Sequence, residues 1–112
     1  MSYKIKSRIW IEHENNVLLG EGRVQLLKAI NDTGSLSKAA KSLNISYKKA
    51  WDLVDSVNKS AKQPVTINSI GGKGGGGAEL TEYGKSLIQV FDDINKNCWE
   101  FLDLQLEKIK SL

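Results

Sequence analysis

A turn of only three residues separates two short helical patterns in the middle of this chain. Apolar residues recur at the i, i+3, i+4, i+7 spacing of one helix face over residues 36–43 and again over residues 47–61. Asn44-Ile45-Ser46 lies between the two patterns, and a connection of that length joins the two helices of a helix-turn-helix. Ser35 and Ser46 stand where N-cap residues are expected. The spacing therefore predicts a helix-turn-helix over about residues 35–61.

The elements predicted on either side complete a winged pattern. Residues 3–19 alternate around a turn signal and predict a hairpin, and a helical stripe follows over residues 23–32. Two short strand patterns flanking a glycine run predict a wing over about residues 65–80, and a last helical stripe runs over about residues 82–110. We therefore expect a mainly α fold with small β elements (α+β): a winged helix-turn-helix with an N-terminal hairpin and a long C-terminal helix.

Length and hydropathy limit the possible architectures. With 112 residues, the sequence predicts a single domain over residues 1–112. No run approaches the roughly 18 apolar residues of a membrane helix. The start, Met-Ser-Tyr-Lys-Ile-Lys, lacks the apolar region of a secretory signal. We therefore expect a cytoplasmic protein that does not associate with membranes.

The single histidine and single cysteine restrict the chemistry. One His and one Cys cannot assemble a zinc cluster or a nucleophile set of the Ser/His/Asp or Cys/His kind. Gly72, Gly74 and Gly77 match the spacing of a dinucleotide fingerprint, but the βαβ unit that this motif needs does not follow. The sequence therefore predicts no catalytic residue, no metal and no cofactor, and His13 is expected on the solvated surface.

Positive charge is concentrated in the middle of the chain. Residues 35–73 carry seven lysines against two aspartates, a net charge of +5, whereas residues 1–34 carry +1 and residues 74–112 carry −3. A basic segment between near-neutral and acidic ends indicates a face for a polyanion.

Three stretches of the chain form a recognisable set of motifs: Thr33-Gly34-Ser35-Leu36-Ser37, Ile45-Ser46-Tyr47-Lys48-Lys49-Ala50-Trp51-Asp52 and the wing Gly71-Gly72-Lys73-Gly74-Gly75-Gly76-Gly77-Ala78-Glu79-Leu80-Thr81-Glu82-Tyr83-Gly84. Together they resemble the N-terminal DNA-binding domain of the ModE family of molybdate-responsive regulators. The resemblance covers about residues 22–97 and extends distantly to LysR-type domains. It implies a sequence-specific transcriptional regulator that binds double-stranded DNA and is linked to molybdenum metabolism or transport.

The same resemblance bears on the effector. ModE proteins usually continue into a C-terminal part that binds molybdate, and this sequence stops before it. We therefore expect that this chain alone does not bind molybdate.

The candidate DNA contacts lie at the starts of two predicted helices and in the glycine-rich loop. A recognition helix reaches base edges with its N-terminal residues, and lysines and helix N–H groups favour phosphate. Two lysines in a first helical turn are opposed by the helix dipole, so a polyanionic partner explains them better than a solvated surface does. The candidates are Ser35, Ser37, Lys38, Ser46, Tyr47, Lys48, Lys49, Gly72, Lys73 and Gly74.

The last predicted helix is too long for so small a domain. About 30 residues at 1.5 Å each span roughly 45 Å, so the second half of its apolar stripe needs a partner. We expect a homodimer through Phe91, Cys98, Phe101, Leu102 and Ile109. The tryptophans Trp10, Trp51 and Trp99 are expected to pack in the core, the last of them near a subunit interface.

Two other classes of function remain open on the sequence alone. One is a winged-helix adaptor that binds proteins and has lost DNA binding. The other is a small nucleotide-binding enzyme, against which the missing catalytic set argues. The basic, exposed start of the predicted third helix favours DNA over both.

Overall fold

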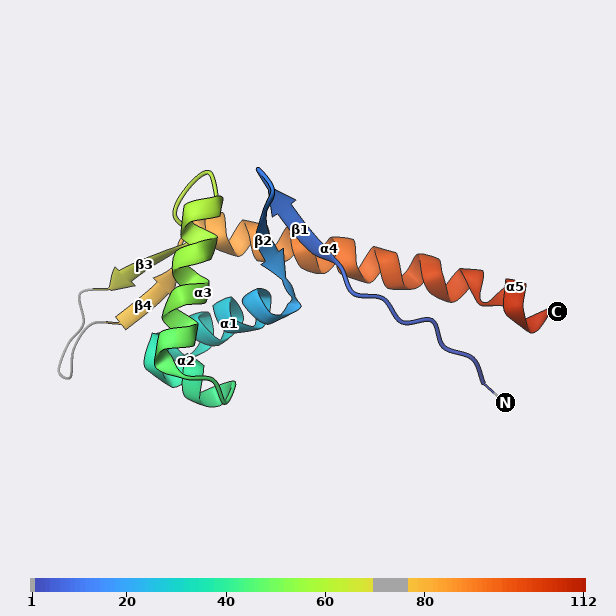
Figure 1. Cartoon of the computed structure of the whole chain (residues 1–112), viewed down its shortest axis with the longest axis horizontal. Helices are drawn as coiled ribbons and strands as arrows, with labels where there is room; N and C mark the ends of the chain where they lie inside the picture. Colours follow the sequence, from blue (N-terminus) through green and yellow to red (C-terminus); the bar gives the residue numbers. More distant parts are fainter. Residues whose placement is uncertain (1, 70–76) are drawn as a thin grey trace.

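The computed structural model describes residues 2–69 and 77–112, and its element order confirms the predicted fold class. A helical body carries a small sheet on either side, and one helix extends far beyond that body (Figure 1). The elements are β1 (Trp10–His13), β2 (Asn16–Gly20), α1 (Glu21–Thr33), α2 (Leu36–Ser42), α3 (Tyr47–Ser60), β3 (Thr66–Ser69), β4 (Gly77–Leu80), α4 (Glu82–Gln105) and α5 (Glu107–Lys110).

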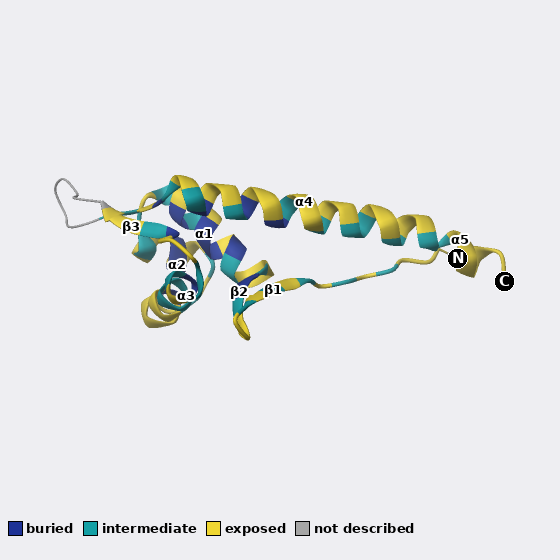
Figure 2. Cartoon of the chain, turned by 90° about the horizontal axis from the view of Figure 1, so that it is seen from above, coloured by how far each residue is buried: buried dark blue, intermediate teal, exposed yellow. Residues whose placement is uncertain are grey.

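The N-terminal hairpin is shorter than the sequence predicts. β1 and β2 pair antiparallel from Trp10↔Gly20 to His13↔Asn16, and residues 3–9 form no strand. The reason is that α1 begins at Glu21, directly after β2, so no residues remain to pair with the earlier segment. Residues 2–9 instead run extended toward the free end of α4 (Figures 1 and 2).

The hairpin tip is tied to the end of α3. The ring nitrogen Nδ1 of His13 donates to the carbonyl oxygen of Ser60, and His13 is half-buried. The expectation of a solvated histidine is therefore wrong, because the turn folds back onto the helix.

Local capping explains where the central helices begin and end. Gly34 ends α1 in the left-handed region with φ 69°, and its N–H donates to the carbonyl of Ile30 at 2.8 Å. The Ser35 hydroxyl accepts the Lys38 N–H at 3.1 Å and caps α2, and the Ser46 hydroxyl accepts the Lys49 N–H at 3.0 Å and caps α3. These contacts confirm the predicted helix-turn-helix.

Two apolar clusters meet at α1. One joins Leu26 and Ile30 of α1 to the alanines of α2 and to Ala50 of α3. The other joins Val24 and Leu27 of α1 to β2, the wing and the start of α4. Because α1 contributes to both clusters, it fixes α3 and the wing relative to each other, and most of the buried residues gather there (Figure 2).

The long last helix begins as predicted and is interrupted near its end. Thr81 caps α4 by accepting the Gly84 N–H at 2.9 Å. The helix breaks at Leu106, and α5 follows as a separate short turn. The chain measures 62 Å along its longest axis, and the second half of α4 extends along that axis, past the helical body (Figure 1). No helix within residues 2–69 and 77–112 is both long and apolar enough to span a bilayer.

Candidate nucleic-acid interface

The first turn of α3 projects from the body of the protein. Tyr47, Lys48 and Lys49 are all exposed, whereas Ala50 behind them is fully buried. Ala50 and Val57 pack the inner face of the helix against the core, so the other faces of its first turn are open to solvent. The structure thus brings three predicted contact residues together at one exposed helix start.

Two ion pairs follow along the outward face of α3. Lys48 Nζ lies 3.3 Å from Asp52 Oδ2, and Lys59 Nζ lies 2.8 Å from Asp55 Oδ2. The hydrogen bond to Asp55 and the charge of that carboxylate raise the pKa of Lys59 above its ordinary value. The outward face is therefore locally close to neutral beyond the first turn.

The start of α2 lies beside the same surface. Ser37 and Lys38 are exposed, and Ser35, whose hydroxyl caps α2, is half-buried. Within the described part of the chain, Lys38 and Lys49 take part in no ion pair. Both ammonium groups are free to approach phosphate.

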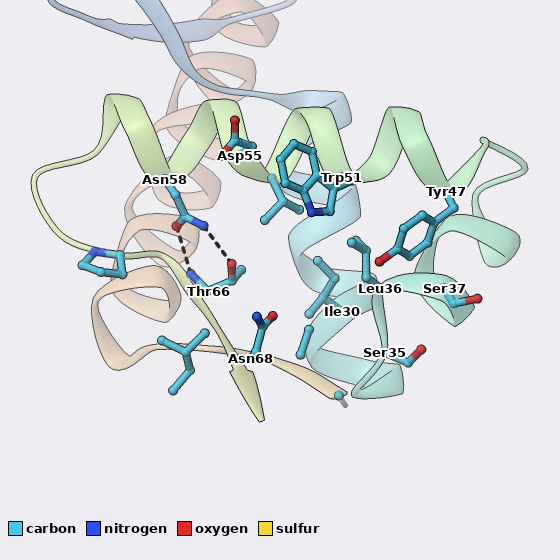
Figure 3. Close-up of a pocket in the computed structure, with 15 residues that line it drawn as sticks. Ile30, Ser35, Leu36, Ser37, Tyr47, Trp51, Asp55, Asn58, Thr66 and Asn68 are labelled. Atoms are coloured by element: carbon cyan, nitrogen blue, oxygen red, sulfur yellow. Dashed lines mark hydrogen bonds between the residues drawn. The ribbon is translucent and has the colours of Figure 1, made fainter. Parts of the chain in front are cut away.

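An open groove of about 740 Å³ separates α3 from the wing. Tyr47 and Trp51 descend into it from α3, opposite the wing strands, and Ser35, Leu36 and Ser37 close one end (Figure 3). The remaining lining comes from Ile30, Val54, Asp55, Asn58, Pro64, Thr66, Ile67, Asn68, Gly77 and Ala78.

Asn58 joins α3 to the wing at the far end of this groove. Its Oδ1 accepts the N–H of Val65 at 2.7 Å. The same Oδ1 accepts the N–H of Thr66 at 3.2 Å, while Nδ2 donates to the Thr66 hydroxyl at 3.0 Å (Figure 3). At the other strand, the Ala78 N–H donates to the carbonyl of Gly34 at 3.0 Å. Both strands of the wing are therefore fixed to the helix-turn-helix.

The wing strands confirm the predicted β elements, but the loop residues lie outside the described structure. β3 and β4 pair antiparallel from Thr66↔Leu80 to Ser69↔Gly77. The candidate contacts Gly72, Lys73 and Gly74 belong to residues 70–76, which the structure does not describe. Their role stays a prediction from the sequence.

The sequence predicts that Trp51 packs in the core, and this prediction is wrong. Its side chain is 51% exposed, and Tyr47 one turn earlier is 57% exposed. One residue along a helix is a rotation of about 100°, so Trp51 cannot share the inner face with Ala50. That angle is the sequence signal that could have placed Trp51 in the interface.

The other two tryptophans divide between surface and partial burial. Trp10 is exposed, and its indole N–H donates to Glu12 Oε2 at 3.0 Å, so the expectation of core packing is wrong for it. Trp99 is half-buried beside Arg8 and Asn95.

The residues predicted for a dimer interface differ in how far they are buried. Phe91 is only 3% exposed and packs in the core of its own chain, so its assignment to an interface is wrong. The Cys98 Sγ lies 3.8 Å from the Ser7 Oγ, and Leu102 is half-buried. Phe101 is 60% exposed and Ile109 is exposed. The N-terminal segment covers part of the predicted stripe, which the sequence pattern could not reveal.

A different apolar face of α4 is open to solvent. Val90, Ile94, Phe101 and Leu104 are exposed, and they follow one another at spacings of four, seven and three residues. These spacings place all four side chains on one side of the helix.

An exposed helix start, a groove beside it and a wing anchored to the same helix define a winged helix-turn-helix domain. No protein-family model matches the chain. Among curated proteins, it is 32% identical over 106 residues to the molybdenum transport protein ModE of Azotobacter vinelandii, covering 95% of this chain and 39% of the relative. It is 50% identical over 70 residues to the transcriptional regulator ModE of Yersinia pestis, covering 62% and 27%.

A third relative carries a different name. The chain is 47% identical over 76 residues to the molybdenum-pterin-binding protein MopB of Rhodobacter capsulatus, covering 68% of this chain and 28% of the relative. These matches confirm the resemblance: the chain carries a ModE-like winged helix-turn-helix domain. It spans 27–39% of the length of these relatives.

Solved structures show the same fold. ArgP from Mycobacterium tuberculosis matches with a TM-score of 0.54 and 16% identity over 76% of this chain and 30% of that protein. The regulator LysG from Corynebacterium glutamicum, with bound effector Arg, matches with a TM-score of 0.56 and 19% identity over 80% and 29%. At these identities the likeness concerns the fold.

Proposed function

We propose that this chain is a sequence-specific DNA-binding transcriptional regulator of the ModE type that acts in molybdenum metabolism or transport. The observation that carries the proposal is the exposed first turn of α3, with Tyr47, Lys48 and Lys49 beside a groove and an anchored wing. The names of the ModE and MopB relatives support the link to molybdenum. The role is one of binding rather than catalysis, and its place is the cytoplasm.

The arrangement fits a DNA duplex in one orientation. A helix about 10–12 Å wide enters a major groove about 12 Å wide. With the start of α3 in that groove, Lys49 and the α2 residues Ser37 and Lys38 face phosphates on its edge. The wing then follows the neighbouring backbone, where Lys73 adds a cation by the sequence prediction. The site therefore combines base contacts from α3 with phosphate contacts on both sides.

We also propose that the chain acts as a homodimer through the open face of α4. Val90, Ile94, Phe101 and Leu104 are large and exposed, and burying one such side chain contributes about 1.5–3 kcal/mol in transfer terms. A second copy of this chain offers the same face, which is the self-complementary contact of a two-fold dimer. Two recognition helices related in this way read an inverted repeat.

The salt dependence of DNA binding tests the phosphate contacts. Fluorescence anisotropy of a labelled duplex is measured across about 50 to 200 mM salt for the unmodified chain and for Lys48→Ala/Lys49→Ala. Each lost phosphate contact lowers the slope of log affinity against log salt by about one unit. The matched control, Lys108→Ala/Lys110→Ala, removes the same charge at the far end of the chain.

The expected result is weaker binding and a flatter slope for the α3 variant alone. An unchanged slope for that variant would overturn the proposal that the first turn of α3 contacts DNA phosphates. The absence of DNA binding by the unmodified chain would favour an adaptor role.

A further inference from the structure

Trp51 has a position that packing within the domain does not explain. It lies one turn after Tyr47 on the side of α3 that faces the wing, and half of its surface is open to solvent. Ile67 of β3 is also exposed and lines the same groove. The groove therefore presents apolar surface from both the helix and the wing.

Three polar residues of α3 that follow Trp51 along the chain are already paired. Asp52 contacts Lys48, Asp55 contacts Lys59, and Asn58 is bonded to the start of β3. Figure 3 shows the indole reaching into the groove, apart from the hydrogen bonds between Asn58 and Thr66. The indole offers a ligand two broad apolar faces and a single N–H donor, so most of the surface that it presents is apolar.

Contact with an apolar aromatic face gives a charged phosphate little binding energy, whereas it stabilises an apolar group in the major groove. The C5-methyl group of thymine is the apolar group that base pairs present there. We infer that Trp51 is a specificity-determining residue that packs against thymine methyl groups at the edge of the bound site. This inference rests on the proposed DNA binding and goes beyond it by naming the group on the bases that Trp51 recognises.

The test begins with DNA that the protein itself selects. The unmodified chain enriches duplexes from a random-sequence pool, and the enriched duplex is then resynthesised with each thymine replaced by uracil, one at a time. Uracil lacks only the C5-methyl group, so base pairing is preserved. We expect one or two positions per half-site at which the replacement weakens binding about threefold to fivefold.

Variants then assign the effect to the side chain. Trp51→Ala is expected to bind the thymine duplex more weakly and to bind the thymine and uracil duplexes equally. Trp51→Leu keeps apolar surface and retains part of the difference. The matched control is Trp10→Ala, which removes an equally exposed indole on β1 and is expected to keep the full sensitivity to uracil. Circular dichroism checks that each variant is folded.

The outcomes separate this inference from the proposed function. If no sequence is enriched from the pool, sequence-specific binding fails and the inference falls with it. If a sequence is enriched but no uracil replacement weakens binding, the proposed function stands and the inference is overturned. The inference is also overturned if Trp51→Ala keeps the same uracil sensitivity as the unmodified chain.

Discussion

The side-chain oxygen of Asn58 accepts the backbone N–H of Val65 at 2.7 Å, which joins the last turn of α3 to the base of the wing. Val65 is fully buried, so its N–H cannot turn to water for a partner. Together with the bond from the Ala78 N–H to the Gly34 carbonyl on the other strand, this amide sets the orientation of the wing relative to the recognition helix.

Replacing Asn58 with Ala is expected to destabilise the protein. The N–H of Val65 loses its partner while it stays buried, which lowers the free energy of unfolding by about 1–3 kcal/mol. Asn58→Asp keeps an acceptor for the N–H groups of Val65 and Thr66, so this variant should lose less stability than Asn58→Ala. Urea unfolding followed by circular dichroism gives both values. Equal stability of Asn58→Ala and the unmodified chain would contradict this role.

Replacing a helical glycine with Ala is expected to lower the free energy of unfolding at one position and to raise it at another. A Cβ at Gly84 would lie 2.4 Å from the carbonyl oxygen of Val65, so the backbone must shift, and we expect a loss of about 1–3 kcal/mol in the free energy of unfolding. Gly22 has no atom within 4 Å of the same added group. Gly22→Ala should stabilise the protein by up to about 1 kcal/mol through helix propensity. Thermal unfolding of the two variants checks the difference in sign.

Asp52 is expected to limit binding to non-specific DNA. Its carboxylate pairs with Lys48 at 3.3 Å and adds negative charge at the proposed interface. Asp52→Asn frees Lys48, and affinity for a random duplex should rise about twofold to fivefold at low salt, as expected for an exposed ion pair. Asp103→Asn makes the same charge change on α4 and serves as the control. Equal anisotropy titrations for the two variants would show that Asp52 has no such role.

The open face of α4 predicts how the oligomeric state can be changed. Phe101 is 60% and Leu104 72% exposed in the single chain, so charges there should leave the fold intact but prevent pairing. We expect Phe101→Asp/Leu104→Asp to sediment at 12.4 kDa and the unmodified chain at twice that mass. Lys96→Asp places a charge elsewhere on the exposed surface of α4 and should still dimerise. A monomeric unmodified chain at tens of micromolar would refute the dimer.

Local sequence signals predicted the framework of the fold well. Ser35 and Ser46 each cap the helix that follows, as the sequence predicts. The cap by Thr81 and the left-handed conformations of Gly34 and Asn44, with φ 69° and 58°, are equally local features. These features depend on a few neighbouring residues, so they can be predicted from the local sequence.

The parts that were not predicted depend on contacts between distant segments. The apolar pattern of α4 contains both Phe91, which packs under its own domain, and Phe101, which does not. Periodicity identifies an apolar face but not which neighbour covers it. The extended N-terminal segment, with Ser7 against Cys98, is such a neighbour. A related limit applies to Trp51, because a large aromatic residue predicts burial and does not by itself indicate that the side chain lines an open groove.

The most direct test of the central claim compares two duplexes at one salt concentration. One carries the sequence enriched by the unmodified chain, and the other is a scrambled duplex of equal length and base composition. The account predicts an inverted repeat in the enriched sequence and an affinity at least about a thousandfold higher than for the scrambled duplex. Equal affinity for the two duplexes would contradict sequence-specific recognition by α3 and the wing.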